Sequence, residues 1–125
     1  MKYIILLLTM ISGQVSLAHE FTPTYPKLET THQMGVLKAS MRLFNKRDDI
    51  RYYRVGVYDS EWNKVPFIVS GGKVINVEYL DTKRFDVYIQ ESKRKDVTYI
   101  CTKSLTLQDG STRSIMASRI CSKVK

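Results

Sequence analysis

Two cysteines on either side of a turn constrain the fold of this chain more than any other feature. Cys101 and Cys121 are its only cysteines, and the run Gln108-Asp109-Gly110-Ser111 between them is rich in turn-forming residues. If the flanking segments pair as antiparallel strands, placing Cys101 opposite Cys121 puts the pivot of the register at Ser111, inside that turn. The turn and the cysteine spacing therefore predict one register for a C-terminal hairpin over residues 97–125.

This register predicts an unusual pair on one face of the hairpin. It sets Lys103 opposite Arg119, and like charges directly opposed across two strands destabilise a sheet. We expect either a local bulge or an anionic partner shared by the two cations. The other face carries scattered apolar residues among serines and threonines, so neither face is a dense core face. The hairpin is therefore predicted to be an edge or a partly exposed ribbon.

Residues 1–18 have the pattern of a secretory signal peptide. Lys2 precedes the apolar run 3–11, and the small residues Ser16 and Ala18 form a cleavage site. The apolar run has about half of the ~20 residues that a membrane span needs, so we expect no transmembrane segment after cleavage. Cleavage after Ala18 would leave a single exported domain, residues 19–125.

Export also affects the expected oxidation state of the cysteines, because the compartment beyond the membrane is oxidising. An even cysteine count there predicts a disulfide between Cys101 and Cys121, which would stabilise the fold by about 3 kcal/mol. A metal site is the alternative for two cysteines. Zinc needs four close ligands, and the only histidines, His19 and His32, form no such cluster with the cysteines. We therefore expect neither a metal nor another cofactor.

Apolar and polar residues alternate with a period of two along 36–44, 51–58 and 85–89, which is typical of half-buried strands. Shorter strands are expected within 62–69 and 74–80, and a proline-interrupted edge segment over 21–28. Segments 81–83 and 91–96 are expected to be loops. No run of ten residues has a helical period, so the sequence predicts an all-β sandwich of seven to eight strands.

No arrangement of residues indicates catalysis. The sequence has no G-x-S-x-G motif, no phosphate-binding glycine motif and no cysteine left free by the disulfide. Acidic residues such as Asp48 and Asp49, or Glu78 and Asp81, could be paired on paper, but acidic residues in loops are usually just solvated. The single tryptophan, Trp62, is expected to cover the end of the core rather than to bind a ligand.

The chain is basic, with 20 lysines and arginines against 12 acidic residues and a net charge of +8. A basic exported protein can meet an anionic envelope surface, and it can also use its charge only for solubility. The basic residues are spread over every segment without a basic helix or a nucleic-acid motif, so nucleic acid is not an expected partner.

The order of several stretches suggests a family. They are F-T-P-T-Y (21–25), M-R-L-F-N (41–45), R-Y-Y-R-V-G-V-Y-D (51–59), V-P-F-I-V-S-G-G (65–72), V-I-N-V-E-Y-L (74–80), R-F-D-V-Y-I (84–89) and V-T-Y-I-C-T-K-S-L (97–105). With these stretches the chain resembles the N-terminal immunoglobulin-like domain of periplasmic pilus-assembly chaperones of the PapD type. The resemblance implies a seven-stranded Greek-key sandwich in the periplasm. In one branch of that family a disulfide joins the last two strands, which suits Cys101 and Cys121.

The resemblance also implies a function. Chaperones of this family lend an exposed final strand to an incomplete pilin, which is a form of β-strand addition. The corresponding donor strand would be Ser114–Lys123, and its candidate partner-binding residues, with two neighbouring cations, are Ile115, Met116, Ile120, Val124, Lys103 and Arg119. The family's chaperones have two such domains and a basic pair in the cleft between them; Tyr25 occupies the first-strand position of that pair here.

The leading hypothesis is therefore an exported, chaperone-like module that binds a protein partner through an exposed β-edge. Its expected place is the periplasm or envelope, in the assembly of a pilus or another surface structure, with an extracellular location as the alternative. Two other functions stay open. One is a structural or adhesive sandwich domain of a surface or virion assembly, and the other is a small secreted enzyme or enzyme inhibitor.

Overall fold

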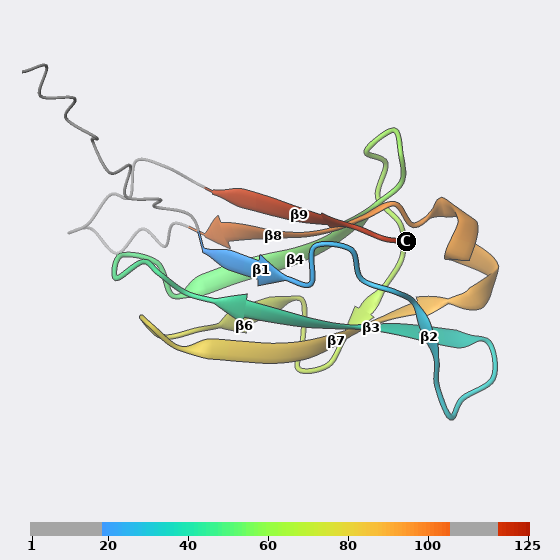
Figure 1. The fold of residues 1–125 in the computed structure, drawn as a ribbon, viewed down its shortest axis with the longest axis horizontal. Coiled ribbons are helices and arrows are strands. Elements are labelled where there is room, and N and C mark those ends of the chain that lie inside the picture. The colour runs from blue at the N-terminus through green and yellow to red at the C-terminus, as the bar shows by residue number, and fades with distance from the viewer. Residues whose placement is uncertain (1–18, 106–117) are drawn as a thin grey trace, which may run out of the picture.

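The computed structural model describes residues 19–105 and 118–125, which form two antiparallel β-sheets packed face to face (Figure 1). The first sheet contains β1 (Glu20–Thr22), β2 (Glu29–Thr30), β3 (Val36–Phe44), β7 (Thr82–Gln90) and β5 (Ile68–Val69), in the order β1-β3-β7-β5 with β2 also paired to β3. The second sheet has the order β6-β4-β8-β9, formed by β6 (Val74–Asn76), β4 (Tyr52–Tyr58), β8 (Tyr99–Leu105) and β9 (Arg119–Lys123). The predicted all-β sandwich is confirmed.

The long strands form where the sequence alternates. In β3, β4 and β7 every second residue is buried, and these residues are Leu37, Ala39, Met41, Leu43, Tyr53, Val55, Val57, Phe85, Val87 and Ile89. The intervening side chains face solvent, so each sheet buries one face against the other. The core that results is the one that the period-two pattern predicts.

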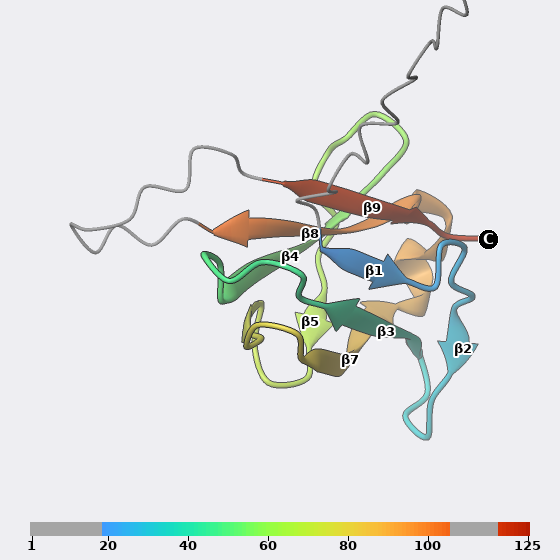
Figure 2. The same cartoon turned by 60° about the vertical axis from the view of Figure 1, so that its left-hand side comes forward.

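From β3 to β8 the chain crosses to the other sheet at every connection, because β3, β5 and β7 belong to the first sheet and β4, β6 and β8 to the second (Figure 2). The crossing from β7 to β8 contains η1 (Glu91–Asp96), a short 3-10 helix with no buried residue. At the N-terminus β1 and β2 lie along the same edge of β3, as the interrupted edge segment predicts. Between them the chain reaches the other sheet, because the carbonyls of Thr24 and Pro26 accept hydrogen bonds from the N–H groups of Lys123 and Lys125, both 3.0 Å long.

Two predicted boundaries are wrong. Segment 81–83, expected to be a loop, contributes Thr82 and Lys83 to β7, because β3 offers a continuous ladder that pairs with both of them. Segment 74–80 is a strand only as far as Asn76. Beyond it the chain bends, with Leu80 in the left-handed region at φ 60° and its N–H bonded to the Asn45 carbonyl. The bend wraps the chain around Asn45 instead of extending β6.

Trp62 does not cover the end of the core, which corrects the prediction for this residue. Its side chain is 47% exposed, and its ring stacks on Tyr99 with centroids 4.2 Å apart and planes 1° apart. A turn over 59–63 brings Trp62 back onto the outer face of β8, and the apolar side chains of the strands fill the core without it.

Candidate functional site

The β8–β9 hairpin has the predicted register. Cys101 lies opposite Cys121 and the two form a disulfide, while Lys103 lies opposite Arg119 without a bulge. The predicted turn at 108–111 falls outside the described residues. The hairpin therefore ends the second sheet, with β9 as its last strand.

The outer edge of β9 is partly open. Ser104 N–H donates to the Ser118 carbonyl and Val124 N–H donates to the Thr98 carbonyl, both at 2.8 Å, so the even-numbered residues of β9 bond to β8. Because bonding pairs alternate along an antiparallel ladder, the N–H and carbonyl groups of Arg119 and Cys121 face outward. From Lys123 onward the outward N–H groups bond to segment 24–26. Among the described residues, the stretch of the edge that is open, in the sense of having no backbone hydrogen-bond partner, is therefore 119–122, and β1 lies close to β9.

The candidate partner-binding residues divide between the two faces of β9. Ile120 and Val124 are half-buried and pack against the core, whereas Arg119 points outward and is exposed. Ile115 and Met116 lie outside the described residues. A contact of any of these residues with a partner stays a prediction.

Aromatic rings, rather than the predicted bulge, position Arg119 opposite Lys103. Its guanidinium lies over the rings of Trp62 and Tyr58, 4.6 Å and 5.0 Å from their centroids. Gly56 makes this possible, because a Cβ atom there would lie 2.7 Å from the Tyr58 hydroxyl oxygen and 2.8 Å from a ring carbon. Cation–π contacts of this kind contribute about 0.5–1 kcal/mol at exposed sites, enough to offset part of the repulsion between the cations.

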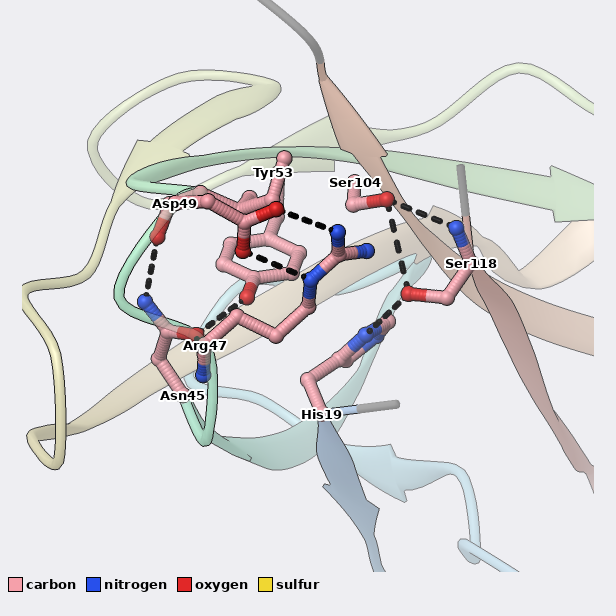
Figure 3. Close-up of polar contacts among 8 residues, drawn as sticks. His19, Asn45, Arg47, Asp49, Tyr53, Ser104 and Ser118 are labelled. Atoms are coloured by element: carbon pink, nitrogen blue, oxygen red, sulfur yellow. Dashed lines mark hydrogen bonds and ion pairs between the residues drawn. The ribbon is translucent and has the colours of Figure 1, made fainter. Parts of the chain in front are cut away.

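His19 ties the first strand to the open edge (Figure 3). It directly precedes β1, is 2% exposed, and its Nε2 and Nδ1 atoms lie 2.6 Å from Thr102 Oγ1 and 3.2 Å from Ser118 Oγ. Ser118 N–H in turn donates to Ser104 Oγ at 2.7 Å. These bonds hold Ser118, the residue directly before β9, against β8 and the start of β1.

Burial lowers the pKa of His19 to about 4 from its ordinary 6.5, and the charge of Arg47 lowers it further, while the hydrogen bond with Thr102 acts in the opposite direction. His19 is therefore neutral in the folded protein at neutral pH. A charged imidazolium in this position would be desolvated and would face another cation.

We expect stability to fall as pH drops from 6.5 toward 4. In that window the unfolded chain binds a proton at His19 that the folded chain does not, so the free energy of unfolding decreases by up to about 3 kcal/mol. Above pH 6.5 the contribution is fully present. Urea unfolding at a series of pH values should show a shallower decline for His19→Gln than for the wild type. Parallel profiles would contradict a buried, neutral His19.

A second group of buried polar residues lies beside His19 (Figure 3). Asn45, fully buried, donates through Nδ2 to the carbonyls of Ile50 (2.6 Å) and Val77 (2.9 Å), and its Oδ1 accepts from Arg47 N–H and the Tyr53 hydroxyl. Burial raises the pKa of Tyr53 to about 12, so the phenol stays a donor.

The loop after Asn45 differs from the prediction. Asp49, expected to be solvated, forms a two-bond ion pair with the buried Arg47, with distances of 2.9 Å and 2.6 Å. This pair and Asn45 fix the loop between β3 and β4. The sequence gives no local signal for the pair beyond the two charges lying two residues apart.

The described residues offer no group of three or more His, Cys, Asp or Glu side chains that could hold a metal ion. Within the same residues, no helix has the length and apolar character needed to cross a membrane. The surface has several open hollows. One of about 510 Å³ lies on the outer face of β4 and β8 and includes Lys103 and Arg119 in its lining.

No protein-family model and no curated protein sequence matches the chain. Its fold is similar to that of the E. coli chaperone DraB and to a chain in the structure of the Salmonella enterica SafA pilin in complex with the SafB chaperone. Each match has a TM-score of 0.63 at 12% identity and covers 86% of this chain and 53% of the other. This chain thus spans about half the length of the chains that it matches. The likeness shows a PapD-like fold.

Proposed function

We propose that this protein is an exported, chaperone-like binding module that takes up an extended segment of a protein partner along the open edge of β9. The observation that carries the proposal is the pair of outward-facing backbone groups at Arg119 and Cys121, on a strand that the disulfide fastens to β8. The fold likeness to chaperones, one of them solved with a pilin, supports it. The signal-like residues 1–18 and the disulfide support export.

Strand addition suits this edge for a physical reason. Unpaired N–H and carbonyl groups on an edge strand can bond to an incoming strand, and the main-chain bonds supply affinity while alternate side chains supply specificity. The disulfide on one side and segment 24–26 at the far end already hold β9 in place. A partner therefore gains hydrogen bonds without having to order the strand that it binds. Of the predicted donor stretch Ser114–Lys123, the described part is 118–123, and it contains this edge.

The partner that we propose is a subunit of a pilus or another surface structure. Such subunits expose a sheet edge until assembly, and the open edge of β9 would cover it. If the purified protein instead becomes a stoichiometric part of a filament or particle, the structural role is favoured over the chaperone role.

Two substitutions at one residue test the edge. Arg119→Pro removes the outward N–H, and edge strands tolerate proline where the N–H faces solvent, so the ladder to β8 stays intact. Arg119→Ala keeps the N–H and loses only the side chain. Each variant, expressed with residues 1–18, is used to capture partners from the envelope fraction, and the captured protein is identified and its affinity measured after purification.

We expect Arg119→Pro to weaken binding of that partner by about tenfold or more, and Arg119→Ala to weaken it far less, because main-chain hydrogen bonds supply the affinity of an added strand. A peptide with the sequence of the partner's strand should compete with the wild type. Similar melting temperatures of the two variants show that the sandwich is intact. Equal binding by the proline and alanine variants would overturn the proposal.

A further inference from the structure

Three cations form a row across the outer face of the second sheet. The strand register places Arg54 of β4 opposite Lys103 of β8, and Lys103 opposite Arg119 of β9. The disulfide fixes this register, because Cys101 and Cys121 are paired on the same face, each two residues from the cation on its strand. Like charges directly opposed are destabilising, so the protein holds an arrangement that an anion would relieve.

Two more cations join the row in one hollow. The hollow of about 510 Å³ is lined by Arg54, Lys103 and Arg119 together with Lys64 and Lys73. Backbone contacts fix the added lysines: Lys64 pairs with Tyr58 in a β-bridge, and the Lys73 carbonyl accepts from Val55 N–H at 2.8 Å. Among the described residues, no carboxylate lines the hollow and none forms an ion pair with these five cations.

Aromatic rings position two of the cations. Arg119 lies over Trp62 and Tyr58, and Lys73 Nζ lies 4.5 Å from the centroid of the Phe67 ring. Trp62 itself is held at φ 65°, in the left-handed region that a bulky residue rarely adopts.

Several hydrogen bonds fix the turn that contains Trp62. Asp59 Oδ1 accepts from the N–H groups of Glu61 (2.9 Å) and Asn63 (2.8 Å), and Trp62 N–H donates to the Asp59 carbonyl at 3.1 Å. Strained residues held in this way cluster at ligand clamps. The Asp59 carboxylate accepts hydrogen bonds within its own turn and, in the described part of the chain, forms no ion pair with the row of cations.

We propose that this hollow binds a soluble ligand that carries several phosphate groups close together, such as a short phosphate chain. Guanidinium groups bond phosphate oxygens in pairs, and lysines add point charges around them. An acidic peptide suits the hollow less well, because side chains of an extended chain alternate in direction and spread their charge. The cations line a concavity rather than a plane, which favours a small solute over a membrane surface. The inference does not rest on strand addition at β9.

The single tryptophan provides a local readout, because Trp62 contacts Arg119 at the hollow. Titration with inorganic tripolyphosphate should change the fluorescence of Trp62 and reach saturation. Orthophosphate should bind about tenfold more weakly or worse, since it offers a single group to the five cations. The measurements are made at about 0.15 M salt, where non-specific attraction between exposed charges is screened.

Matched double variants test the residues. Arg54→Gln/Lys103→Gln should weaken tripolyphosphate binding by about tenfold or more, because it removes two of the charge-assisted bonds. Lys93→Gln/Arg94→Gln removes the same charge from the exposed η1 and should leave binding unchanged. The first variant should also melt at the same or a higher temperature than the wild type, because it relieves the repulsion in the row.

Several results would overturn the proposal. Equal weakening by both double variants would mean that only net charge matters. Absence of a fluorescence change with tripolyphosphate would mean that the hollow is not the site. Binding to vesicles of phosphatidylcholine and phosphatidylglycerol in equal parts, without binding of tripolyphosphate, would assign the face to a membrane surface instead.

Discussion

Replacement of Asn45 by alanine is expected to lower the free energy of unfolding by about 3–5 kcal/mol, because each buried polar group left without a partner costs about 1–3 kcal/mol. The Asn45 side chain is fully buried and serves the carbonyls of Ile50 and Val77, the N–H of Arg47 and the hydroxyl of Tyr53. Alanine would leave these buried groups without their partner inside the sandwich. Urea unfolding followed by circular dichroism measures the loss.

The control for this prediction is Asn76→Ala. Asn76 is an asparagine of the same size on β6, but its side chain is exposed. Its replacement should change the free energy of unfolding by less than about 0.5 kcal/mol, as surface substitutions usually do. A loss at Asn45 no larger than that at Asn76 would mean that water or a neighbouring group replaces the amide, and the buried network would then not be structural.

Removal of the disulfide is the second large effect. Cys101 and Cys121 are 20 residues apart in sequence, and opening a loop of this size raises the entropy of the unfolded chain by the equivalent of about 3 kcal/mol. We expect Cys101→Ser/Cys121→Ser, and equally Cys121→Ser alone, to lower the free energy of unfolding by about that amount in the chain-entropy model. The β8–β9 ladder keeps the hairpin paired in the native state, so the sandwich should still form.

The wild type provides its own comparison for the disulfide. Its reduced form should melt close to the double serine variant and well below the oxidised form. Equal melting of oxidised and reduced protein would contradict the prediction. The pair of measurements also separates loss of the crosslink from any packing effect of the serine side chains.

The sequence was sufficient for the regular part of the fold. Segment 36–44 alternates over nine residues and became β3 with the predicted boundaries, because the period of two places Leu37, Ala39, Met41 and Leu43 in the core. The short strands were harder. β5 and β6 are set by the strands beside them, β7 and β4, and their own residues carry too few alternations to define their ends.

The sequence predicted only those features of the candidate site that depend on residues close together in the chain. The turn and the cysteines placed Lys103 opposite Arg119 correctly. The contact between the Arg119 guanidinium and the Trp62 ring depends on a left-handed turn and on contacts between three segments of the chain. No pattern in the sequence predicts these contacts. His19 is a similar case, since its partner Ser118 lies 99 residues away. Long-range contacts of single side chains leave no periodic signal.

The contacts of the N-terminal segment determine when this sandwich can close. His19 and Thr24 find their partners in Thr102, Ser118 and Lys123, near the other end of the sequence. Contacts of such large separation form late and slowly, because the whole intervening chain must be brought together first. The two sheets can therefore be joined along this edge only after residues 102–123 are available to the N-terminal segment. The hydrogen bonds that complete the fold thus also set the order in which it forms.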